Sequence, residues 1–174
     1  FLGAGCYEHF IPSIVKHMIG RSEFYTAYTP YQPEASQGTL QALFEYQSLI
    51  CELTGMDVSN GSHYDGSTAL AESVLMTLHE TKRRKVLIAS SVHPDYRCVT
   101  NTYLTGTNFE SREISFASGP TGRGPGGDSN FELNLDSLKK ELNNDVASLV
   151  IQSPNFFGSI EKLNEMETLV HQNG

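Results

Sequence analysis

Apolar residues recur three and four positions apart in several stretches of the chain, a spacing that predicts amphipathic helices. These stretches are residues 11–20, 36–54, 61–80, 94–106, 135–143 and 161–172. Shorter strand-like segments predict strands over residues 56–60, 85–90, 111–116 and 146–152. The run KVLIAS at 85–90 is continuously apolar, which is typical of a strand buried on both faces of a parallel sheet.

Strand and helix alternate from residue 56 onward, and this order predicts an α/β fold with a mainly parallel sheet flanked by helices. Such sheets bind ligands at the carboxyl ends of their strands, so the loops after residues 60, 90, 116 and 152 are the places to look for a site. The Gly-rich segment TGRGPGGDSN, residues 121–130, predicts an exposed loop.

We expect two parts, residues 1–38 with an N-terminal helix and an extended interface arm, and residues 39–174 with a partial α/β large domain. The arm is the segment YTPYQPEASQG at 28–38, which Pro30 and Pro33 make stiff and extended. The chain begins with Phe1 instead of Met and ends directly after a predicted helix, so we expect it to be a fragment of a longer protein.

Charge and cysteine usage exclude several classes of protein. The net charge of −8 argues against a general affinity for nucleic acid or anionic lipid, and the basic run KRRK at 82–85 is interpreted as solvated charge. The three cysteines have no zinc-type spacing, which favours a reducing compartment. No apolar run approaches the ~20 residues of a membrane-spanning helix, and the sequence as given predicts no signal peptide.

The first candidate binding site is the segment HYDGSTA, where a predicted helix begins with Gly66, Ser67 and Thr68. Free N–H groups, the helix dipole and two hydroxyls together suit an anion or a phosphate. The competing interpretation is a helix start that is capped by its own side chains and holds nothing.

Two further candidates follow buried strands. His93 in SVHPDYR could stack on an aromatic ligand or act as a base, or it could be a hydrogen-bonded loop residue. Asn155 in SPNFFGSIE offers a polar group at a strand end, although a tight structural turn fits equally well. A triad of Ser67, His93 and Asp95 is rejected because no nucleophile elbow is present, and His63 with His93 lacks the spacing of a metal site.

Four segments of the chain resemble the P-protein family of the glycine cleavage system, glycine dehydrogenase (decarboxylating), in its N-terminal half or separate first subunit. They are FLGAGCYEHFIP, EFYTAYTPYQPE, GSHYDGSTALAE and QSPNFFGSIE, in the family's order. The resemblance implies the large domain of a fold-type I pyridoxal phosphate enzyme. It also implies that the complete enzyme decarboxylates glycine and passes the aminomethyl group to the lipoylated H-protein.

The resemblance implies further that this chain is the partner without the cofactor lysine. None of its lysines suits a Schiff base, so pyridoxal phosphate is expected on a lysine-bearing subunit 2, with no covalent cofactor and no catalytic residue here. Gly66, Ser67, Thr68, His93 and Asn155 would then form a vestigial cofactor site. Tyr28, Tyr31 and Glu34 on the arm would contact subunit 2, or would only cover this subunit's own helix.

Two alternatives stay open from the sequence. The chain could belong to another enzyme of the same fold, such as an aminotransferase or a cysteine desulfurase cut before its lysine, or it could be a non-catalytic assembly module. We expect a cytoplasmic location in a bacterium and a mitochondrial one in a eukaryote. The isolated fragment is expected to be inactive and to self-associate.

Overall fold

The computed structural model describes residues 4–116 and 131–173, so the predicted loop at 121–130 lies outside the described residues. Its helices are α1 (Ser13–Ile19), α2 (Ser22–Tyr25), α3 (Gln37–Thr54), α4 (Gly66–Thr81), α5 (Pro94–Leu104), α6 (Leu135–Glu141) and α7 (Leu163–His171). Its strands are β1 (Lys85–Ala89), β2 (Glu110–Ile114) and β3 (Val146–Val150). Most predicted elements are therefore confirmed.

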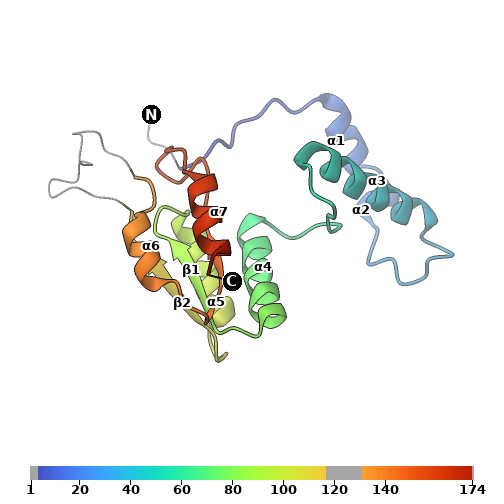
Figure 1. The fold of residues 1–174 in the computed structure, drawn as a ribbon. Helices are drawn as coiled ribbons and strands as arrows, with labels where there is room; N and C mark the ends of the chain where they lie inside the picture. The colour runs from blue at the N-terminus through green and yellow to red at the C-terminus, as the bar shows by residue number, and fades with distance from the viewer. Residues whose placement is uncertain (1–3, 117–130, 174) are drawn as a thin grey trace. The chain divides into compact units, whose positions relative to one another are not determined.

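The strands form one parallel sheet in the order β2-β1-β3. β1 is central and pairs with Glu110–Ile114 on one side and with β3 on the other, with a shift of register after Lys85. Figure 1 shows α7 in front of these strands and α5 behind them. The α/β architecture with a parallel sheet, expected from the apolar runs, is confirmed.

The core lies between the sheet and the helices around it. β1 is buried from Val86 to Ala89, as its continuous apolar run predicts. Leu78 of α4, Leu138 of α6 and Met166 of α7 are almost fully buried against the same cluster. Each of these helices therefore contributes one apolar stripe to a shared core.

The chain separates into two compact units, Tyr7–His63 and the remainder, Phe1–Cys6 with Tyr64–Gly174, as far as these are described. The sequence placed the division at 38/39, whereas the structure groups α3 with the N-terminal segment because no side chain of α3 joins the core cluster. Where the division falls in the whole protein stays a prediction.

The strand predicted over residues 56–60 is wrong, because this segment has no regular secondary structure. α3 ends where Gly55 adopts a left-handed conformation with φ 71°. The following chain is held by a hydrogen bond from Gln47 Nε2 to the carbonyl of Ser59, at 2.5 Å. The segment is thus hydrogen-bonded to a helix side chain.

In the described part of the chain, none of the helices combines the length and the apolar character needed to cross a membrane.

Candidate functional site

The start of α4 is capped by Asp65, the residue just before it. The Asp65 carboxylate accepts hydrogen bonds from the Ser67 hydroxyl at 2.6 Å and from the Thr68 backbone N–H at 2.8 Å. The Thr68 hydroxyl in turn accepts the Asp65 N–H, which completes a reciprocal capping box. The bonds from Ser67 and Thr68 lower the pKa of the Asp65 carboxyl below its ordinary value, so it is an anion at neutral pH.

Gly66 lies where Tyr96 of α5 closely approaches the start of α4. A Cβ atom on Gly66 would lie 2.5 Å from the Tyr96 hydroxyl oxygen and 3.1 Å from the ring carbon that bears it. The absence of a side chain therefore lets the first turns of α4 and α5 lie together. The packing of α4 against α5 supplies a structural reason for this glycine that does not involve a ligand.

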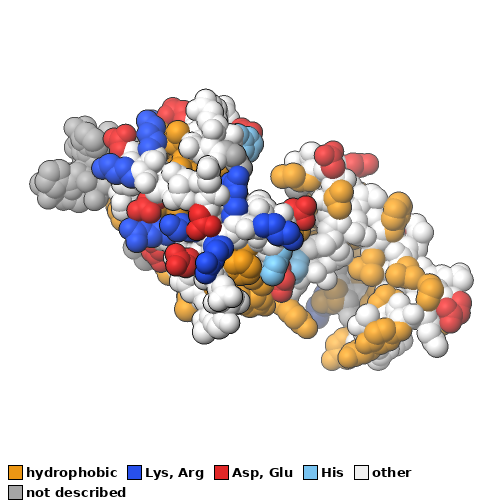
Figure 2. All heavy atoms as spheres, turned by 60° about the horizontal axis from the view of Figure 1, so that its bottom comes forward, with side chains coloured by type: hydrophobic (Ala, Val, Ile, Leu, Met, Phe, Trp, Pro, Cys, Tyr) orange, Lys and Arg blue, Asp and Glu red, His pale blue; other side chains and the backbone are white. Residues whose placement is uncertain are grey.

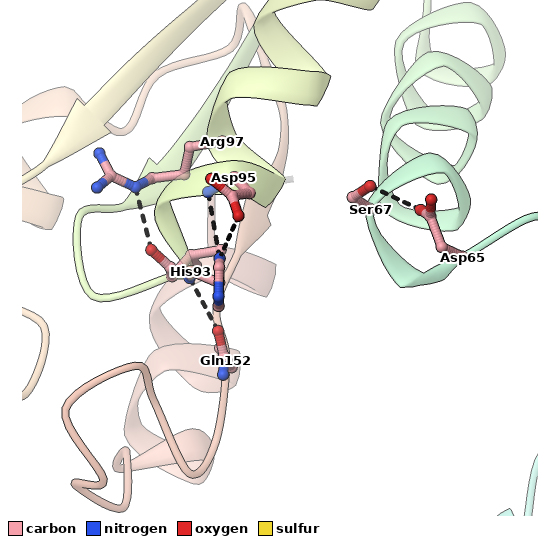
Figure 3. A network of polar contacts seen from close by, with 7 residues as sticks. Asp65, Ser67, His93, Asp95, Arg97 and Gln152 are labelled. Atoms are coloured by element: carbon pink, nitrogen blue, oxygen red, sulfur yellow. Dashed lines mark hydrogen bonds and ion pairs between the residues drawn. The ribbon is translucent and has the colours of Figure 1, made fainter. Parts of the chain in front are cut away.

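His93 caps the other helix start, that of α5. Its Nδ1 accepts the Asp95 backbone N–H at 3.2 Å, and its own backbone N–H donates to Gln152 Oε1 at 2.9 Å (Figure 3). The imidazole lies 5.4 Å from the ring of Tyr96 and 5.0 Å, edge to face, from the ring of Phe156. Nδ1 therefore faces the start of α5, with the Asp95 carboxylate 3.9 Å away.

Asn155 is buried and uses all of its hydrogen-bonding positions within its own surroundings. Its amide donates to the carbonyl of Phe131 and to Glu161 Oε1, both at 2.9 Å. Its Oδ1 accepts the backbone N–H groups of Phe157 at 3.0 Å and of Ser159 at 3.1 Å. No capacity is left for a ligand, so its part in the structure is to fix the loop after β3.

Glu161 is a buried acid that sequence reasoning missed. Only 4% of it is exposed, and its carboxylate accepts from Asn155, from the Ser91 hydroxyl and from the backbone N–H of Leu133, each at 2.9 Å. These donors come from three separate segments, so Glu161 ties the ends of β1 and β3 to the chain that leads into α6. No sequence signal identified it, because glutamate is usually exposed.

The structure brings the predicted site residues near one another in part. Gly66 contacts Tyr96, which contacts His93, and His93 contacts the residue after Asn155. In Figure 3, Asp65 and Ser67 belong to the start of α4 while His93 and Asp95 belong to the start of α5. Among the hydrogen bonds of the described residues, none joins these two groups.

The residues at α4 do not fit the phosphate of pyridoxal phosphate. The Thr68 N–H and the Ser67 hydroxyl, which would bind an anion, already bind the Asp65 carboxylate, and that negative charge repels a phosphate. All the lysines are at least partly exposed, including Lys162 before α7. No step of the cofactor's chemistry is therefore assigned to residues of this chain.

Metal binding has no support within the described residues, where no group of three or more His, Cys, Asp or Glu side chains is placed to hold an ion. His63 also belongs to the Tyr7–His63 unit, whereas His93 belongs to the sheet unit.

The arm presents its aromatic side chains to solvent. Tyr28 is 81% exposed and Tyr31 is 73% exposed, and their rings lie 6.0 Å apart. Glu34, also exposed, sits in a turn just before α3. In the Tyr7–His63 unit no helix buries any residue, and Figure 2 shows hydrophobic side chains over its surface.

Comparison with known proteins places these features in a family. The model of the family described as "Glycine cleavage system P-protein" matches residues 1–174. A protein of Geobacillus thermodenitrificans named "Probable glycine dehydrogenase (decarboxylating) subunit 1" is 56% identical over 99% of this chain. A protein of the same name from Moorella thermoacetica is 53% identical over 99%. These matches leave the aminotransferase and cysteine desulfurase alternatives without support.

A solved structure is similar along the same length. It is described as glycine decarboxylase (P-protein) of the glycine cleavage system in inhibitor-bound form, and it matches with a TM-score of 0.81 and 43% identity over 99% of this chain. The chain spans only 36% of that structure and 36% of the Geobacillus and Moorella relatives.

Proposed function

The chain belongs to the glycine cleavage system P-protein family, and from this membership we propose that it is part of subunit 1 of a glycine dehydrogenase (decarboxylating). The observation that carries the proposal is the 56% identity to a protein of that name over 99% of this chain. The complete enzyme would remove carbon dioxide from glycine and transfer the remaining aminomethyl group to a lipoylated H-protein. Because the chain is about a third of its relatives in length, the activity belongs to the whole assembly.

Pyridoxal phosphate would supply the electron sink for this decarboxylation, and we propose that a lysine-bearing subunit 2 holds it. Two features of this chain support that assignment. Its lysines are exposed or half-exposed, and Asp65 occupies the helix start at which a phosphate would bind. The role of the candidate site residues would then be structural, because they cap α4 and α5 and pack these helices together. These residues are Gly66, Ser67, Thr68 and His93.

The arm is proposed to contact subunit 2. Tyr28 and Tyr31 expose large aromatic surface on a backbone that two prolines stiffen, and such surface is enriched in protein interfaces. A stiff backbone loses little conformational entropy on docking. Glu34 would add a charged contact at the same surface. For the bacterial protein we propose a cytoplasmic location, in keeping with the bacterial sources of the relatives.

The test uses the full-length subunit 1 that contains this chain, co-expressed with subunit 2. Release of carbon dioxide from carboxyl-labelled glycine is measured with lipoylated H-protein, with unlipoylated H-protein and with each subunit alone. We expect release only from the pair with lipoylated H-protein. Release from the pair that is independent of H-protein, or no release at all, would contradict the proposed function.

Cofactor placement needs a separate measurement on the same pair. Borohydride reduction in the presence of pyridoxal phosphate, followed by peptide mass analysis, reports which lysine carries the cofactor. We expect the label on subunit 2 only. A reduced cofactor on any lysine within the segment that corresponds to this chain would overturn the assignment without affecting the assayed activity.

A further inference from the structure

Asn60 and Gly61 are adjacent in the segment that joins α3 to α4. This segment has no regular secondary structure, Asn60 is exposed, and Figure 1 shows an irregular connection between the two helices. The backbone nitrogen of a residue that follows an asparagine can attack the side-chain amide carbon of that asparagine and close a five-membered ring. The two groups belong to neighbouring residues, so their proximity favours this reaction.

Neither of the two reacting groups is held by the protein. Among the hydrogen bonds of the described residues, none involves the side chain of Asn60, and none has the backbone N–H of Gly61 as its donor. A helix or a sheet would occupy that N–H with a backbone carbonyl. The nitrogen of Gly61 and the amide of Asn60 can therefore meet without the loss of a hydrogen bond.

The hydroxyl of Ser59 is placed to assist the attack. Ser59 Oγ donates to the backbone carbonyl of Asn60 at 3.1 Å. When the Gly61 nitrogen loses its proton, the negative charge is shared with this carbonyl oxygen, so a donor on the oxygen stabilises the attacking anion. The backbone of Ser59 is itself restrained, because its carbonyl accepts Gln47 Nε2 at 2.5 Å.

The described surroundings of Gly61 give no structural reason for a glycine. Gly61 is not among the described glycines with a positive φ, whereas Gly55, at the end of α3, has φ 71°. A Cβ atom on Gly61 would lie 3.6 Å from Leu43 Cδ2, an ordinary van der Waals contact. An alanine would therefore fit, and what the glycine provides is an open approach to its backbone nitrogen.

We propose that Asn60 is a site of spontaneous deamidation, assisted by the Ser59 hydroxyl. The Gly61 nitrogen gives its proton to hydroxide and bonds to Asn60 Cγ, and the amide nitrogen takes a proton from water and leaves as ammonia. Water then opens the resulting succinimide at either of its two carbonyls. The product at residue 60 is aspartate or isoaspartate, so one water is consumed and one carboxylate is gained. This inference does not depend on the proposed activity.

Asn144 provides an internal control. It is also exposed, and its side chain takes part in none of the hydrogen bonds of the described residues. The residue that follows it, Asp145, carries a side chain, and the backbone N–H of Asp145 already donates to Asn143 Oδ1 at 2.9 Å. Asn173 also precedes a glycine, but its side-chain amide donates to the carbonyl of Leu169 at 2.9 Å. Asn60 alone among these combines an exposed, unbonded amide with an available nitrogen.

The test is incubation of the folded full-length protein that contains this chain in water enriched in heavy oxygen. Peptide mass analysis measures the heavy oxygen taken up at each asparagine, and chromatography separates aspartate from isoaspartate peptides. Gly61→Ala adds only the tolerated Cβ atom. Ser59→Ala removes the hydroxyl and keeps the carbonyl that Gln47 binds. Circular dichroism checks that both variants are folded.

We expect heavy oxygen at residue 60, with isoaspartate among the products, and none at Asn144. Gly61→Ala should show no conversion over the same incubation. Ser59→Ala should slow the conversion about twofold to tenfold, which is the effect of one ordinary hydrogen bond on a rate. No conversion of Asn60 in the folded protein, equal conversion of Asn60 and Asn144, or an unchanged rate in either variant would overturn the proposal.

Discussion

The Asp65 carboxylate accepts the Thr68 backbone N–H at 2.8 Å, and so it fills the helix start where the sequence suggested an anion site. The Ser67 hydroxyl and the Thr68 N–H, which were candidates for binding an anion, are the groups that bind the Asp65 carboxylate. In this conformation the donors satisfy the protein's own carboxylate, whose pKa they lower.

The Asp65 cap predicts a specific dependence of stability on pH. Because the pKa of the folded carboxyl lies below its unfolded value of about 3.9, the stabilisation is complete above that value and is lost as the pH falls through the lowered folded pKa. Asp65→Asn keeps a capping oxygen but does not titrate there. We expect the melting temperature of the parent subunit to fall more steeply than that of Asp65→Asn in acid. Parallel curves would show that the cap does not contribute.

The contact between Gly66 and Tyr96 predicts coupled mutations. Gly66→Ala places a methyl group against the Tyr96 hydroxyl and should lower the free energy of unfolding by about 1–3 kcal/mol. Tyr96→Phe removes the atom that would lie 2.5 Å away but leaves the ring carbon at 3.1 Å, so we expect a partial rescue. A double-mutant cycle by urea denaturation measures this coupling. Equal costs of Gly66→Ala in both backgrounds would exclude the contact as the cause.

The strands and long helices were predictable because their apolar spacing is a local property. The run at 85–90 and the stripe with Val74 and Leu78 show this directly, since burial follows the pattern. The strand predicted at 56–60 is wrong because only Met56 and Val58 alternate there, among residues that strands disfavour, and the segment is instead hydrogen-bonded to Gln47 of α3. A short apolar run does not carry that information.

The site was less predictable because its key relationships join distant residues. Position after a buried strand pointed to the loops of His93 and Asn155, whose part in a site stays a prediction. It could not show that Asn155 binds Glu161, or that Tyr96 lies over Gly66, since these contacts depend on how the helices pack. The Asp65 cap did have a local signal, because Asp is a preferred residue immediately before a helix start.

The buried carboxylate of Glu161 predicts a large effect of a small substitution. Glu161→Gln replaces an accepting oxygen with an NH₂ group that faces a donor, which should cost about 1–3 kcal/mol of stability. Glu165→Gln, on the exposed surface of α7, should change it by less than about 0.5 kcal/mol. Urea denaturation of the full-length subunit compares the two. Similar small effects would mean that the three hydrogen bonds are not maintained in solution.

The exposed arm predicts a defect in assembly. Replacing both Tyr31 and Glu34 with Ala in full-length subunit 1 removes an aromatic anchor and a charge from the proposed contact with subunit 2. Truncation of a buried interface tyrosine commonly costs more than about 1 kcal/mol, so we expect the dissociation constant of the pair to rise about tenfold or more. Analytical ultracentrifugation measures that constant, and decarboxylation is assayed at a subunit concentration near it.

A matched control tests whether loss of any exposed aromatic side chain weakens the pair as much as loss of the arm residues. Tyr64 is fully exposed and lies outside the arm, so Tyr64→Ala should leave the affinity of the pair unchanged. The melting temperature of the isolated subunit distinguishes the remaining possibility, that the arm covers only its own helix. Lost subunit stability with unchanged affinity would assign Tyr31 and Glu34 to local structure. Weaker affinity with unchanged stability would assign them to the interface, because only a surface buried by the partner changes association without changing the free subunit.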